Sequence, residues 1–300
     1  MLLRIGTRFS TLSRKQTELV VESLKTVEEN LEVEIIPIIT KADQILDKTL
    51  HQIGGKGLFL KELEYALLEN KIDIAVHSLK DVPGKIEDNF IIASVLERGD
   101  PRDVLISKEK FLLDNFSDIP KYHSIATSSV RRKLIIQNLR PDIEVKFIRG
   151  SVERRLERLI CENFDSLILS RVVLDRLDLD AKDLNYYNLA IEEFLPSAGQ
   201  GTIAIEVLKN NVEIINLCKK INNLSSWYLS LAERSFLKIL GANCSDPVAA
   251  YAQYKGDKIS AKYMIFSKKF NKIIYHTEIG EIFEAESIGE SAAQKLLMNL

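Results

Sequence analysis

Cysteine is scarce in this 300-residue chain: Cys161, Cys218 and Cys244 stand far apart. An odd number of distant cysteines without a CxxC pair indicates neither a disulfide framework nor a cysteine-based metal site. We expect free and mostly buried thiols, because cysteine is among the most buried residue types. The four histidines show no ligand spacing, so we expect no metal, and His77, which follows an apolar run, should be a packed side chain.

Long apolar runs are missing as well. No stretch of 18 apolar residues is present, and the first residues, MLLRIGTR, lack the apolar centre of an export signal. We therefore expect no membrane association and a cytoplasmic location. A formal net charge of −2 gives no sign of a nucleic-acid partner. With 46% hydrophobic and 28% charged residues, the composition is that of a soluble protein of two or three domains.

Arginine is missing from one end of the chain and crowded elsewhere. Fourteen of the fifteen arginines precede residue 180, nine of them between Arg131 and Arg176, and only Arg234 follows residue 218. Arginine binds carboxylates and phosphates through two parallel hydrogen bonds. The crowding indicates an anionic ligand, with a solvated basic helix face as the alternative.

The run 72–83, IDIAVHSLKDVP, organises the rest of the chain. Its alternating apolar residues at 72–76 predict a buried strand, which Pro83 ends soon afterwards. His77, Ser78, Lys80 and Asp81 follow the strand, and ligands of open α/β sheets bind beyond such carboxyl ends. A surface ion pair at a loop is the simpler alternative.

Strands and helices alternate around this run. We expect strands at 2–7, 33–40, 72–76, 90–95, 104–107, 124–126, 143–148, 167–169 and 202–207, and helices at 10–30, 58–70, 129–139, 152–161, 172–177 and 211–222. The alternation predicts mainly parallel sheets. A helix at 227–240, strands at 248–254, 258–266 and 272–278, and a helix at 285–298 predict a small α+β domain. Residues 41–57, which are polar and rich in glycine, predict a mobile loop and lack P-loop spacing.

The chain contains a weak internal repeat. Ile5-Gly6-Thr7 corresponds to Ile125-Ala126-Thr127, strand 33–40 to strand 143–148, and Asp73 and Ser78 to Asp165 and Ser170. This pattern predicts two similar α/β domains that face each other across a cleft. Bends at 97–103 and 196–201 would be the two crossovers between them.

Six short motifs in a fixed order point to one family. They are Gly54-Gly55-Lys56-Gly57-Leu58-Phe59, His77-Ser78-Leu79-Lys80-Asp81-Val82-Pro83, Asp100-Pro101-Arg102-Asp103, Thr127-Ser128-Ser129-Val130-Arg131-Arg132, Arg149-Gly150 with Arg155, and Gly199-Gln200-Gly201. Together they resemble porphobilinogen deaminase (hydroxymethylbilane synthase) over essentially the whole chain.

The resemblance implies an α/β fold of three domains. Two would resemble type II periplasmic binding proteins around a cleft, and the third would be a small α+β C-terminal domain. The expected ranges are 1–98 with 199–218, 102–195, and 219–300. The resemblance also implies a monomer.

The family resemblance implies a transferase of tetrapyrrole and heme biosynthesis. It would condense four molecules of porphobilinogen head to tail with release of ammonia, on a dipyrromethane cofactor held by a thioether to Cys244, and then release hydroxymethylbilane by hydrolysis. The residues before Cys244, Gly241-Ala242-Asn243, depart from the usual Gly-Gly-Cys or Gly-Ser-Cys turn, as does Asp246 after it. Val172-Val173-Leu174 replaces the usual Ala-Gly-Leu before Arg176.

The expected site combines one carboxylate with many cations. Loss of ammonia from porphobilinogen leaves a positive charge, which Asp81 would stabilise while it also manages protons. Residues expected to bind the carboxylates of substrate and cofactor are Arg8, Ser10, Gln16, Lys56, Ser78, Lys80, Thr127, Ser128, Ser129, Arg131, Arg132, Arg149, Gly150, Arg155, Arg176 and Gln200. Gly54, Gly55, Gly57 and Phe59 would form an active-site loop. A non-catalytic two-lobed anion-binding or sensor protein is the rival, since the same cleft and arginines would serve it.

Overall fold

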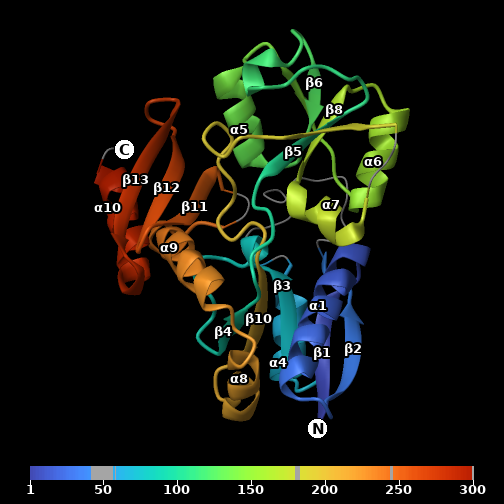
Figure 1. The fold of residues 1–300 in the computed structure, drawn as a ribbon, viewed down its shortest axis with the longest axis vertical. Helices are drawn as coiled ribbons and strands as arrows, with labels where there is room; N and C mark the ends of the chain where they lie inside the picture. Colours follow the sequence, from blue (N-terminus) through green and yellow to red (C-terminus); the bar gives the residue numbers. More distant parts are fainter. Residues whose placement is uncertain (42–56, 58, 180–182, 244–245, 299–300) are drawn as a thin grey trace.

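The computed structural model describes residues 1–41, 57, 59–179, 183–243 and 246–298, which form three sheets with their helices (Figure 1). The first sheet has the order β2-β1-β3-β10-β4. Its strands are β1 (Leu2–Arg8), β2 (Glu32–Ile38), β3 (Ile74–Ser78), β4 (Phe90–Val95) and β10 (Ile203–Leu208), and its helices are α1 (Thr11–Val27), α4 (Lys61–Leu68) and α8 (Val212–Lys219). Pro37 is tolerated within β2 because that strand lies at the edge of the sheet.

The second sheet has the order β7-β6-β8-β5-β9 and lies above the first in the view of Figure 1. Its strands are β5 (Asp103–Ser107), β6 (Ser124–Ala126), β7 (Glu144–Lys146), β8 (Ser166–Ser170) and β9 (Asn185–Asn188), and its helices are α5 (Val130–Leu139), α6 (Val152–Cys161) and α7 (Arg171–Leu177). The central strands β5 and β8 are buried throughout, as apolar runs covered on both faces should be.

The internal repeat predicted from the sequence is confirmed by the strand orders of the two sheets. In sequence, β1, β2 and β3 correspond to β6, β7 and β8, and each trio takes the same place in its sheet. The Asp73 carboxylate accepts from the Arg4 amide at 2.8 Å, and the Asp165 carboxylate accepts from the Ser124 amide at 2.8 Å. Each aspartate, just before the third strand of its trio, therefore fastens that strand to the first.

The sheets are mainly parallel, as expected. In each sheet four of the five strands run in one direction, and only β10 in the first and β5 in the second run antiparallel to their neighbours. Two other features of these domains differ from expectation. Strand β9 was not expected, since its sequence NYYN has no apolar alternation. Cys161 is exposed, although Cys218 is buried as expected, and burial raises the pKa of the Cys218 thiol to about 12.

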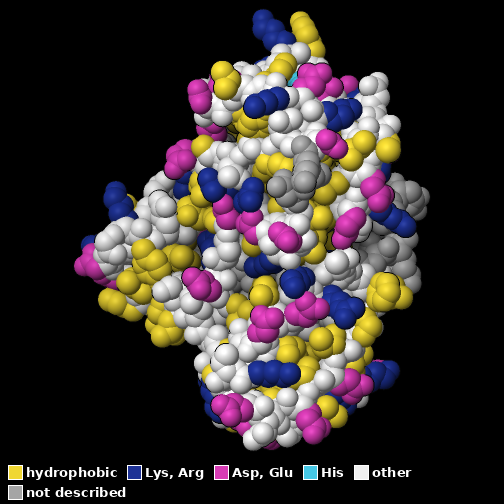
Figure 2. Space-filling view, turned by 45° about the vertical axis from the view of Figure 1, so that its right-hand side comes forward, with side chains coloured by type: hydrophobic (Ala, Val, Ile, Leu, Met, Phe, Trp, Pro, Cys, Tyr) yellow, Lys and Arg dark blue, Asp and Glu magenta, His cyan; other side chains and the backbone are white. Residues whose placement is uncertain are grey.

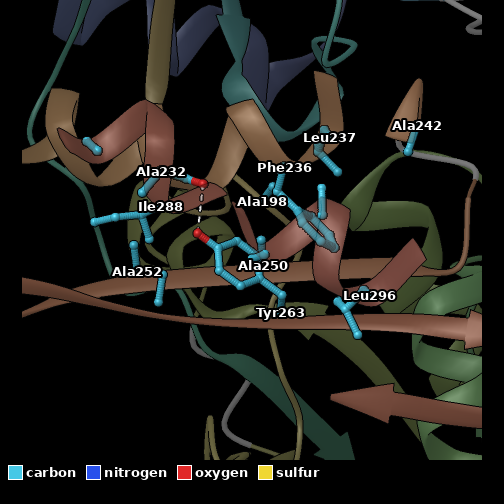
Figure 3. Close-up of a cluster of buried hydrophobic side chains, with 14 of the residues drawn as sticks. Ala198, Ala232, Phe236, Leu237, Ala242, Ala250, Ala252, Tyr263, Ile288 and Leu296 are labelled. Carbon is cyan, nitrogen blue, oxygen red and sulfur yellow. Dashed lines mark hydrogen bonds between the residues drawn. The ribbon is translucent and has the colours of Figure 1, made fainter. Parts of the chain in front are cut away.

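The C-terminal domain contains the third sheet, β11-β12-β13, covered by two packed helices (Figure 1). The elements are α9 (Leu224–Leu240), β11 (Val248–Lys255), β12 (Lys258–Ser267), β13 (Lys272–Glu281) and α10 (Ala285–Met298). Phe236 and Tyr263 lie at the centre of the core, and the Tyr263 hydroxyl donates to the Ala232 carbonyl at 3.0 Å (Figure 3). No helix in the described part of the chain is both long and apolar enough to cross a membrane.

Candidate active site

A short turn follows β3 and carries Lys80 and Asp81. It comprises the 3₁₀ segment Leu79–Asp81 and the next two residues, and we call 79–83 the β3 turn. Buried Leu79 and Val82 anchor it, and the Leu79 amide donates to the Thr202 carbonyl at 2.9 Å. Lys80 and Asp81 are half-buried. The packed apolar residues thus leave the polar ones at the strand's carboxyl end.

Arg8 and Phe59 lie beside Asp81. Arg8 Nη1 is 4.0 Å from Asp81 Oδ2, and its guanidinium lies 4.2 Å from the centre of the Phe59 ring. A guanidinium stacked on an aromatic face is attracted electrostatically by the ring. Ser10 caps α1 by accepting from the Ser13 amide at 3.1 Å, which fixes the chain directly after Arg8.

Lys80 connects the first domain to the second. Its ammonium donates to Ser170 Oγ at 3.3 Å, at the end of β8, and to Gln200 Oε1 at 3.4 Å, in the second crossover. Burial and repulsion by Arg132 lower the pKa of Lys80 to about 8. Ser78, just before the turn, accepts from Gln16 Nε2 at 2.8 Å, so α1 also helps to hold this strand end.

Asp103 binds both arginines at the start of α5. Its side chain is wholly buried; Oδ2 accepts from Arg131 Nη2 at 2.7 Å and Oδ1 from Arg132 Nη2 at 2.8 Å. Gln200 Nε2 also donates to Oδ1 at 2.8 Å. Burial alone would raise the pKa of Asp103, but the two guanidinium groups and these hydrogen bonds hold it below its usual range.

Arg131 and Arg132 differ in how many of their guanidinium nitrogens have hydrogen-bond partners. Arg131 donates from Nε to Ser197 Oγ at 3.1 Å and from Nη1 to the Leu195 carbonyl at 2.6 Å, so all three of its nitrogens bind protein atoms. Arg132 donates from Nη1 to the Ile168 carbonyl at 2.8 Å, while its buried Nε finds no partner among the described residues. Arg132 is thus the member with an unused donor.

Further cations surround Arg132. Burial, with repulsion by Arg132 and Arg149, lowers the pKa of Arg155 to about 10, and Arg155 donates to the Gly150 carbonyl at 2.9 Å. The negative charge of Asp81 raises the pKa of Arg155, so this carboxylate and this guanidinium interact electrostatically. Arg176 donates to the Gly201 carbonyl at 2.6 Å, and burial lowers its pKa to about 10.

The start of α5 adds hydroxyl groups to this region. Ser129 caps the helix, accepting from the Arg132 amide at 3.4 Å, and Thr127 Oγ1 accepts from the Ser129 amide at 3.2 Å. A helix N-terminus favours anions. Figure 2 shows Lys and Arg side chains together with acidic ones across the waist of the molecule, between the upper and lower domains.

The structure brings together many of the expected residues from both domains. Arg8, Lys80, Asp81, Arg132 and Arg155 are linked by direct contact or by mutual electrostatic effects. Gly54, Gly55, Lys56 and Cys244 lie outside the described residues, as does the expected mobile loop except for its two ends. His77 is a packed side chain as expected, with Nε2 2.9 Å from Glu206 Oε2.

Sequence reasoning missed two residues that contact the cations of the site. Asp103 belongs to a recognised motif but carried no role, and Ser170 entered only as a repeat position. The signal for Asp103 was available in principle, since a buried strand that begins with aspartate needs a cation beside it.

The arrangement suits a ligand with several carboxylates and a reaction that develops positive charge. Buried and half-buried cations from both domains are suited to binding the former, and a carboxylate such as Asp81 can stabilise the latter. Comparison with known proteins decides the family. The model described as porphobilinogen deaminase, dipyromethane cofactor binding domain, matches residues 3–216, and that described as porphobilinogen deaminase, C-terminal domain, matches residues 227–298. The chain belongs to the porphobilinogen deaminase family.

Curated relatives of the family match nearly the whole chain. Porphobilinogen deaminase of Rickettsia prowazekii is 44% identical over 296 residues, covering 98% of each chain. That of Alkaliphilus metalliredigens is 38% identical over 295 residues, covering 98% of this chain and 92% of its own. Among solved structures, the extracellular-binding protein of a probable amino-acid ABC transporter from Bacillus subtilis covers 74% of this chain and 90% of its own, with a TM-score of 0.45 at 11% identity.

Proposed function

We propose that this porphobilinogen deaminase family member condenses four porphobilinogen molecules head to tail, releases ammonia, and frees hydroxymethylbilane by hydrolysis. The observation that carries the proposal is the grouping of Asp81 with cations from two domains, in a chain matched by the family models at both ends. A non-catalytic anion-binding protein would need the cations but not a carboxylate among them.

The residues present fit a dipyrromethane cofactor. The unused Arg132 Nε, the half-buried Arg155 and the start of α5 offer donors for its carboxylates, and Cys244 supplies the thiol for attachment. When bound, the group supplies the end to which new pyrrole units are added. We propose Arg132, Arg149, Arg155 and Arg176 as the principal carboxylate-binding residues, with Ser128 and Ser129 adding hydroxyl donors.

We propose Asp81 as the catalytic residue. Its carboxylate follows a buried strand, and Arg8 Nη1 lies 4.0 Å from its Oδ2. There it can stabilise the positive charge that develops on porphobilinogen as ammonia leaves, and it can hold the proton exchanged at the reacting carbon. Arg8 and Lys80 would bind the substrate's acetate and propionate groups.

The test is intact-mass spectrometry with a turnover assay. The purified protein should carry the added mass of two pyrrole units, and Cys244→Ser should be folded but lack that mass. A wild-type protein without the adduct and without consumption of porphobilinogen would refute the proposal. The full adduct on Cys244→Ser would move the attachment to another residue.

We also propose the division 1–98 with 199–218, 102–195, and 219–300. Support comes from the strand order, since β10 shares a sheet with β1, β3 and β4. The resemblance further supports a monomer located in the cytoplasm, with no nucleic-acid or membrane partner. Light scattering on the purified protein tests the monomer, and limited proteolysis tests the boundaries.

A further inference from the structure

Helix α9 of the C-terminal domain holds the backbone of the β3 turn. Arg234, the only arginine after residue 218, donates from Nη1 to the Val82 carbonyl at 3.2 Å and from Nη2 to the Pro83 carbonyl at 2.9 Å. Burial lowers the pKa of Arg234 to about 10, and the charge of Glu206 partly opposes this. One planar guanidinium that binds two consecutive carbonyls fixes their orientation as well as their position.

The residue after the turn approaches the same helix. A Cβ on Gly84 would lie 2.5 Å from the Leu237 carbonyl carbon and 2.6 Å from the Lys238 nitrogen, so only glycine fits here without a shift of the backbone. The Gly84 amide donates to the Ala242 carbonyl at 3.3 Å. Leu237 and Ala242, both labelled in Figure 3, lie along and just beyond the last turn of α9. The chain that follows the β3 turn therefore packs closely against the C-terminal end of α9.

These contacts lie on one side of Asp81 in the sequence. Before Asp81, the turn is held by domain 1 itself, through the Leu79 amide and the Thr202 carbonyl at 2.9 Å. After Asp81, Val82 is buried, and its carbonyl and that of Pro83 are held by a side chain from another domain. Asp81 thus lies between one attachment to its own sheet and one to α9.

We propose that Arg234 is a positioning residue for Asp81, acting through the carbonyls of Val82 and Pro83, and that Gly84 permits the close approach this requires. The inference rests on the proposed catalytic role of Asp81 and extends it to the C-terminal domain. It makes the direction of the catalytic carboxylate depend on α9, and not only on the sheet that carries the turn.

The experiment compares variants in the full-length holoenzyme by intact mass, melting temperature, KM and single-turnover rate. Arg234→Gln should keep the pyrrole adduct and a similar KM but lower the single-turnover rate by about ten- to a hundredfold, since small displacements of a catalytic group are costly. Arg234→Lys should recover part of the rate, because an ammonium group reaches one carbonyl. Gly84→Ala should slow turnover in the same way.

Lys262→Gln is the matched control. Lys262 of the C-terminal domain donates to the Glu192 carbonyl of the second domain at 3.0 Å, so its loss loosens an interdomain bond of the same kind away from the β3 turn. We expect it to keep the wild-type rate well below its melting temperature.

Two outcomes would overturn the inference, and neither depends on how Arg234→Gln folds. One is a wild-type single-turnover rate in both Arg234→Lys and Gly84→Ala; the other is an equal loss of rate in Lys262→Gln. Failure of the proposed function would instead appear in the wild type, as absence of adduct and turnover.

Discussion

Replacement of Asp103 by asparagine tests how the buried charges at the start of α5 are balanced. The carboxylate is wholly buried and binds Arg131, Arg132 and Gln200 at 2.7–2.8 Å. The neutral amide would leave two buried cations without a counter-charge, and its nitrogen would face a guanidinium donor. Breaking a buried pair on one side costs about 3–5 kcal/mol, so we expect Asp103→Asn to unfold more easily by that amount.

The measurement is the free energy of unfolding in urea, with the melting temperature as a second readout. A loss of this size corresponds to roughly 5–8 °C in a chain of this length, at about 2.1 cal/mol/K of unfolding entropy per residue. Asp100→Asn is the matched control. Asp100 lies three positions before Asp103, and it binds the half-exposed Arg102 at 2.6 Å. A half-exposed pair contributes about 0–1 kcal/mol.

A double-mutant cycle sharpens the test. Arg131→Leu should cost less stability in the Asp103→Asn background than in the wild type, since the counter-charge is already missing. Equal unfolding free energies for Asp103→Asn and Asp100→Asn, or full additivity with Arg131→Leu, would refute the reasoning.

Three further predictions concern single side chains. Burial and the charge of Glu206 raise the pKa of Glu64 from 4.5 to about 7, so the folded chain keeps a proton that the unfolded chain loses, and stability falls as pH rises across that window. The free energy of unfolding of Glu64→Gln, measured in urea, should therefore exceed that of the wild type by at most about 3 kcal/mol at about pH 8. The difference should disappear near pH 4.5. Lys80 loses its charge as pH rises through about 8, so KM for porphobilinogen should rise there, and Lys80→Arg should move the rise to higher pH; an unchanged profile would argue against Lys80 as a substrate ligand. Asp81→Asn should keep the adduct yet raise the barrier by about 2.7–4 kcal/mol in single turnover, whereas Arg132→Leu should purify without adduct; the reverse pattern would exchange the two roles.

The sequence was sufficient where local pattern and packing agree. The strand at Phe90–Val95 and the helices at Val152–Cys161 and Ala285–Met298 have the predicted bounds, because their apolar spacing matches the face they bury. Strand β9 could not be found in this way, since the polar sequence NYYN pairs only at the edge of a sheet. The antiparallel placement of β10 and β5 depends on crossovers, which local periodicity does not encode.

The candidate site was predictable by residue type but not by partner. Family motifs singled out both Arg131 and Arg132, and nothing in the local sequence distinguishes the two. The difference arises because Leu195, Ser197 and Asp103, all distant in sequence, bind every nitrogen of Arg131. Arg234 was missed for the same reason, since its partners are backbone carbonyls 152 and 151 positions earlier.

The position of β10 has a consequence for how the chain folds while it is being translated. It lies between β3 and β4, yet it is translated only after the whole of the second sheet, with residues 96–202 between β4 and β10. At about 5–20 residues per second the ribosome needs roughly 5–20 s for that stretch, during which β3 and β4 lack their common neighbour. The second sheet, by contrast, is formed entirely from residues 103–188. The second sheet can thus form first. Until β10 is translated, the edges of the apolar strands β3 and β4 with which it pairs stay unpaired.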